Sequence, residues 1–90
     1  MIGNCYRFTV SGTVQGVGFR YFTAMKAKEL NITGYVRNMA NGEVEVVAIG
    51  SDKKLNELSD WLRKGPRLSN VSEVKMEAAI APPFHDFRIS

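Results

Sequence analysis

The first passage from strand to helix in this chain reads CYRFTVS over residues 5–11 and GTVQGVGFR over residues 12–20. Apolar and polar residues alternate in the first segment, which predicts a half-buried strand over Cys5–Ser11. Beyond the glycine-rich loop, Phe22, Met25 and Leu30 recur at helical spacing and predict a helix from Tyr21 to Leu30 with these side chains on its apolar face. The chain therefore begins with a strand, a loop and a helix.

Four further segments complete the pattern. Strands are predicted over Tyr35–Met39 and Glu43–Ile49, joined by a turn at Asn41-Gly42, where both residues tolerate positive φ. A second helix is expected between the capping residues 50–52 and the Gly65-Pro66 stop, because one apolar stripe runs along it: Leu55, Leu58, Trp61 and Leu62. Alternation over residues 73–78 predicts a fourth strand, and Phe87 with Ile89 predicts a short final one.

This order of elements, β-α-β-β-α-β with a small extra C-terminal strand, predicts an α+β fold. It is the ferredoxin-like sandwich, an antiparallel sheet with two helices on one face. Ninety residues make one domain, residues 1–90. This architecture hosts many unrelated functions, so function must be argued from the loop.

Composition narrows the class of protein. The 44% apolar and 23% charged residues are ordinary for a folded domain, and the net charge of +3 fits small anions or, more weakly, nucleic acid. Cys5 is the only cysteine, so no internal disulfide forms and a cysteine-based zinc site lacks its sulfurs. Neither a signal peptide nor a stretch of about twenty apolar residues is present. We expect a cytoplasmic monomer that needs no metal or other cofactor and binds neither membrane nor nucleic acid.

The glycine-rich loop predicts an oxyanion cradle. Gly16 and Gly18 let successive backbone amides turn toward one point, the helix start adds unpaired donors, and Arg20 contributes a planar forked cation. A Walker loop needs Gly-Lys followed by Ser or Thr, and a dinucleotide fingerprint needs a glycine at position 21. Both patterns fail here, so the loop is predicted to bind a phosphate in another way.

Asn38 is the second candidate, because the topology brings the end of the central hairpin near Arg20. Its amide can hold a water molecule by two hydrogen bonds without ionising. No serine or cysteine paired with a histidine, carboxylate cluster or metal-ligand set accompanies it. Such a site suits a leaving group that departs unaided, and the carboxylate of an acyl phosphate, whose acid has a pKa of about 4, is one.

Two segments closely resemble the signatures of the acylphosphatase family: VSGTVQGVGFR over residues 10–20 and GYVRNMANGEV over residues 34–44, continued to Gly50. The resemblance extends over nearly the whole chain and implies a ferredoxin-like fold and hydrolysis of carboxyl-phosphate bonds. It implies that Arg20 is the phosphate-binding catalytic arginine and Asn38 the water-positioning asparagine. The cradle would be the backbone of Gln15, Gly16, Val17, Gly18 and Phe19. Many relatives place threonine after the asparagine, where this chain has Met39.

Other readings stay open. The loop could be a tight structural turn with an exposed arginine. A ferredoxin-like sheet can bind single-stranded RNA, but the aromatic-rich signature is absent and Glu43 and Glu45 would repel phosphates. A non-catalytic module that binds acyl or carbamoyl phosphate, similar to domains of larger hydrogenase maturation proteins, is the third reading, and the chain's small size speaks against it.

The remaining reactive or charged residues have simpler interpretations. His85 is interpreted as a surface or packing residue in the terminal strand, Cys5 as an inert strand cysteine, and Trp61 as part of the core. Three arginines are expected to be solvated, with one of them helping to attract an anionic substrate: Arg7, Arg37 and Arg67.

Overall fold

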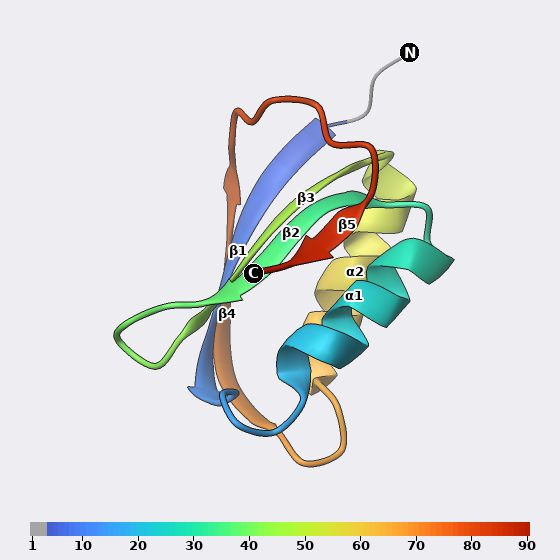
Figure 1. Ribbon diagram of the computed structural model, residues 1–90. Helices are drawn as coiled ribbons and strands as arrows, with labels where there is room; N and C mark the ends of the chain where they lie inside the picture. The colour runs from blue at the N-terminus through green and yellow to red at the C-terminus, as the bar shows by residue number, and fades with distance from the viewer. Residues whose placement is uncertain (1–3) are drawn as a thin grey trace.

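The structure is a computed structural model that describes residues 4–90. Its elements follow the predicted order, and Figure 1 shows both helices on one face of the sheet. This is the ferredoxin-like α+β fold that the sequence predicts. The bounds are β1 (Asn4–Thr13), α1 (Phe19–Glu29), β2 (Thr33–Asn38), β3 (Val44–Gly50), α2 (Asp52–Lys64), β4 (Asn70–Ala78) and β5 (Phe87–Ile89).

The sheet has the strand order β4-β1-β3-β2-β5. The first four strands in this order pair antiparallel, as predicted, and the extra strand β5 pairs parallel to β2, so the sheet as a whole is mixed. The chain reverses after β4 and crosses the end of the sheet to its other edge, where it runs in the direction of β2 (Figure 1). The crossing places the C-terminal residues beside β2.

The core lies between the sheet and the helices. Alternate residues of the central strands are fully buried there, among them Phe8 and Val10 of β1 and Val44 and Val46 of β3. The leucines of α2 at positions 55, 58 and 62 are buried against them, as the predicted stripe requires. Ser51 caps α2 by accepting a hydrogen bond from the Lys54 amide at 3.3 Å.

The buried face of α1 differs from the prediction. The helix begins at Phe19 rather than Tyr21, and its buried residues are Phe19, Thr23, Ala24 and Ala27. Phe22 and Met25 are 45% and 51% exposed. The prediction is confirmed for Leu30, which is buried, but it is wrong for Phe22 and Met25, because small alanine and threonine side chains let the helix lie close to the sheet. Two large apolar side chains are therefore left on the surface.

Strands β1 and β4 are longer than predicted because they pair with each other beyond an irregularity between Ser11 and Gly12. Gly12 has φ of 124°, and a Cβ at this position would lie 2.1 Å from the Asn70 carbonyl oxygen. Only glycine permits this close approach.

None of the helices in residues 4–90 has the length and apolar character needed to cross a membrane.

Candidate active site

The loop between β1 and α1 has the backbone geometry of an anion cradle. Gly16 and Gly18 adopt φ of 76° and 80°, in the left-handed region that glycine enters without strain. Gly18 is also the N-cap of α1 and has no side chain to cap it. The first helical hydrogen bond runs from the Phe22 amide to the Gly18 carbonyl at 3.1 Å. The amides of residues 19–21 therefore have no intrahelical acceptor.

These amides border a cleft of about 180 Å³. Its lining residues come from the loop, α1, β2 and β5: Val14, Gly16, Gly18, Phe19, Arg20, Tyr21, Asn38 and Ile89. The cleft thus brings Arg20 and Asn38 to one place, as the topology predicts. Gln15 and Val17, also predicted as cradle residues, do not line it. The first turn of α1 contains no acidic residue, so its positive dipole end is not offset there.

Arg20 lies in the first turn of α1 rather than at the end of the loop. Its Nη1 atom donates a hydrogen bond to the Ser90 oxygen at 2.7 Å. This contact orients the guanidinium from the C-terminal segment, beside Ile89 in the cleft wall. One of the five guanidinium N–H groups is used, and the rest of the fork stays available for an anion. The sequence had no signal for this partner, which depends on the parallel placement of β5.

Asn38 is the last residue of β2 and faces the core side of the sheet, two residues after the fully buried Val36. Its Oδ1 atom is buried, and among the described residues no donor reaches it. The Thr23 hydroxyl, in the second turn of α1, is likewise buried and has no hydrogen-bond partner within residues 4–90. A buried acceptor without a protein partner is costly unless something else donates to it. The Asn38 amide is therefore suited to hold a small polar group in the cleft.

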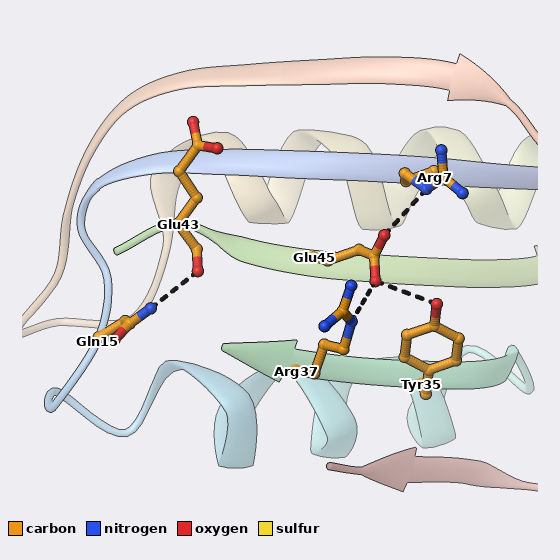
Figure 2. Close-up of polar contacts among 6 residues, drawn as sticks. All are labelled: Arg7, Gln15, Tyr35, Arg37, Glu43 and Glu45. Carbon is orange, nitrogen blue, oxygen red and sulfur yellow. Dashed lines mark hydrogen bonds and ion pairs between the residues drawn. The ribbon is translucent and has the colours of Figure 1, made fainter. Parts of the chain in front are cut away.

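Gln15 acts through its side chain, which sequence reasoning missed. Its Nε2 atom donates to the carbonyl oxygens of Met39 at 2.8 Å and Glu43 at 2.9 Å. Figure 2 shows the side chain reaching from the loop to the backbone at the start of β3. The two bonds tie the cradle loop to the hairpin that follows Asn38. Met39 takes part through its carbonyl, which does not depend on the side chain at this position.

On the opposite face of the sheet, Glu45 is only 5% exposed and is paired with two arginines. Its carboxylate lies 3.0 Å from Arg7 Nε and 2.6 Å from Arg37 Nε, and it accepts a hydrogen bond from the Tyr35 hydroxyl at 3.1 Å (Figure 2). Both arginines are exposed, as expected, and they also compensate this buried charge. Burial alone would raise the pKa of Glu45, but the bonds from Arg37 and Tyr35 outweigh it and lower that pKa. Glu45 is therefore not a free acid on this surface.

The other residues considered from sequence lie away from the cleft. His85 is exposed, precedes β5 rather than lying in it, and lines a separate hollow with Lys28 and Asp86. Burial raises the pKa of the Cys5 thiol, which disfavours the reactive thiolate. Trp61 packs on the core as predicted but keeps part of its surface open. Across residues 4–90, no group of three or more His, Cys, Asp or Glu is placed to hold a metal ion.

The fold and cleft define a class, a small ferredoxin-like domain with an anion-binding cleft at a helix start. The acylphosphatase family model matches residues 6–89. An acylphosphatase of Vibrio parahaemolyticus is 46% identical over 85 residues, 94% of each chain.

Solved structures agree with the sequence comparisons. An acylphosphatase from Coxiella burnetii superposes with a TM-score of 0.92 at 42% identity, covering 97% of this chain and 92% of that one. The acylphosphatase from Bacillus subtilis has a TM-score of 0.91 at 35% identity, covering 100% and 99%. The chain belongs to the acylphosphatase family and functions as a hydrolase of that family.

Proposed function

We propose that this protein hydrolyses the carboxyl–phosphate bond of acyl phosphates, releasing a carboxylate and inorganic phosphate, without a metal ion. The observation that carries the proposal is the cleft itself. It is lined by the glycines of the loop, the guanidinium of Arg20 and the amide of Asn38. Its volume of about 180 Å³ is small, as a site for a phosphoryl group should be.

The first step is binding of the phosphoryl group. The unpaired amides at the start of α1 donate to the oxygens of the phosphoryl group. Arg20 adds charge-assisted hydrogen bonds from the N–H groups that do not bind the Ser90 oxygen. Charge spreads over these outer oxygens in the loose transition state of phosphoryl transfer. Donors already fixed in place stabilise this charge without reorganising, which is why they accelerate the reaction.

The second step is attack by water. Asn38 Oδ1, to which no group in residues 4–90 donates, accepts a hydrogen bond from the water, while the Asn38 NH₂ group donates to the water oxygen. The two bonds aim an oxygen lone pair at phosphorus. The bond between phosphorus and the carboxyl oxygen breaks, and the carboxylate leaves as a stable anion, with no protein acid needed to protonate it. The proton of the water passes to an oxygen of the phosphoryl group.

We also propose the finer setting in which the enzyme works. Residues 1–90 act as one acylphosphatase-like domain, as a monomer in the cytoplasm, on small molecules and without nucleic acid. Gel filtration with light scattering tests whether the protein is a monomer. A binding assay with labelled RNA at low salt tests the exclusion of nucleic acid, because an electrostatic interaction is strongest at low salt.

The enzyme assay measures phosphate release from acetyl phosphate with a chelator present. Replacing Arg20 or Asn38 with alanine is expected to lower kcat about a hundredfold to a thousandfold, the effect of losing one oxyanion donor elsewhere. Arg20→Lys is expected to lose nearly as much, because a point charge cannot replace the planar fork. Arg63→Ala, which removes an exposed arginine of α2, is the matched control. Full activity of Arg20→Ala contradicts the mechanism, and retention of substrate without phosphate release favours the binding-module alternative.

A further inference from the structure

Exposed apolar side chains gather around the cradle. Among residues 4–90, the large apolar side chains with substantial exposure are Tyr21, Phe22, Met25, Leu68, Ile80 and Ile89. Tyr21 and Ile89 line the cleft, while Phe22 and Leu68, 45% and 73% exposed, line a second hollow next to it. Four of these six side chains therefore line the cleft or the hollow beside it.

The second hollow lies between the β1–α1 loop and the α2–β4 loop. It has a volume of about 400 Å³, more than twice that of the cleft. Its lining is Val17, Phe22, Trp61, Pro66, Arg67 and Leu68. Figure 1 shows the two loops at the same end of the molecule. A Cβ on Gly65 would lie only 3.3 Å from the Phe19 ring, so the start of the α2–β4 loop packs closely against the start of α1.

The cleft and the hollow share one segment of chain. Gly16 and Gly18 line the cleft, whereas Val17, between them, lines the hollow. In the same way Tyr21 borders the cleft and Phe22 the hollow. The boundary at Gly18 carries no side chain, and a Cβ there would stand 3.3 Å from the Phe22 ring. A molecule held by its phosphate can therefore extend across bare backbone into the hollow.

We propose that this hollow binds the acyl group of the substrate, and that the preferred substrates are acyl phosphates with an apolar acyl group, aromatic or branched. The proposal rests on the proposed function. Five of the six lining residues are apolar, and a hollow of this size and character suits an apolar ligand group. The sixth, Arg67, is exposed, so the charged residue of the lining attracts an anionic substrate rather than repelling it.

The test compares two substrates that share the phosphate and differ in the acyl group, acetyl phosphate and benzoyl phosphate. The ratio of their kcat/KM values is measured for the wild type and for Phe22→Ala/Leu68→Ala. We expect the double variant to lower the benzoyl-to-acetyl ratio at least about tenfold, the scale of apolar discrimination in an enzyme pocket. The intrinsic reactivities of the two substrates cancel, because the same pair is used for each protein.

Met25→Ala is the matched control. Met25 is an exposed apolar residue of the same helix that does not line the hollow, so its ratio should equal that of the wild type. Competitive inhibition by phenylphosphonate and by methylphosphonate gives a second readout without turnover. The double variant should bind phenylphosphonate more weakly than the wild type does, while its affinity for methylphosphonate stays the same.

The outcomes separate the two proposals. Hydrolysis of both substrates with a ratio that the double variant leaves unchanged overturns the acyl site and keeps the proposed function. If Met25→Ala lowers the benzoyl-to-acetyl ratio as much as the double variant does, the acyl site is also overturned, because the effect is then not specific to the hollow. Failure of the folded wild type to hydrolyse either substrate overturns the proposed function, and the acyl site with it.

Discussion

Replacing Gln15 tests whether the cradle loop must be tied to the central hairpin. Gln15→Met keeps the length and approximate volume of the side chain but removes both hydrogen bonds to the Met39 and Glu43 carbonyls. A hydrogen bond contributes about 0.5–1.5 kcal/mol net, so two bonds set an upper range of about 1–3 kcal/mol. Each carbonyl keeps a backbone donor, Gly42 for Met39 and Met39 for Glu43. We therefore expect a loss of unfolding free energy of about 1–2 kcal/mol.

Activity should fall more than stability does. Asn38 directly precedes one of the two carbonyls that Gln15 binds, so the same bonds hold the cradle and Asn38 in register. A displacement of about 1 Å in an active site can cost a hundredfold in rate, and we expect kcat to fall about tenfold or more. Urea unfolding and acetyl phosphate kinetics measure the two effects on the same preparations. Gln15→Glu should be worse, because it turns an acceptor charge toward two carbonyls.

Gln15→Met contradicts this expectation if its midpoint of urea unfolding and its kcat both equal those of the wild type. A loss of stability with an unchanged kcat would make Gln15 a structural residue alone. A higher KM with an unchanged kcat would indicate weaker phosphate binding without misplacement of Asn38.

Three other perturbations have definite expected outcomes. Glu45→Gln should destabilise by about 2 kcal/mol at pH 7, the scale of a hydrogen bond to a charged group. The pKa of Glu45 is lower in the folded protein than in the unfolded chain, so the stability difference between wild type and variant should shrink as the pH falls below the unfolded pKa of about 4.3 and vanish below the folded pKa. Urea titrations from pH 7 to pH 2.5 measure this difference, and a constant value over that range contradicts the expectation. Gly18→Ala should lower kcat/KM, since φ of 80° strains alanine and its Cβ meets the Phe22 ring at 3.3 Å, and unchanged kinetics with acetyl phosphate would show that the loop geometry is not needed. Ser51→Ala removes the cap of α2 and should cost about 1 kcal/mol, measurable by thermal unfolding, while leaving kcat untouched.

Short-range spacing was enough to predict most of the architecture. The leucine stripe of α2, its cap at Ser51 and the alternation of β1 are periodic patterns that each element carries within itself. The same is true of the cradle, because the positive φ values at Gly16 and Gly18 are what glycines in a loop permit. Asn38 was reached by adding topology, which brings the end of β2 toward the start of α1.

Only the tertiary structure decided which distant groups meet. Gln15 donates to two carbonyls of the hairpin, Arg20 donates to the Ser90 oxygen, and Glu45 pairs with two arginines. Strand register and the parallel placement of β5 set the distances between these groups. Which face of α1 is buried was decided in the same way, since close packing on the sheet favours small side chains over Phe22 and leaves that ring beside the cradle. Periodicity acts over a few residues, whereas partners far apart in sequence are chosen by how whole elements pack.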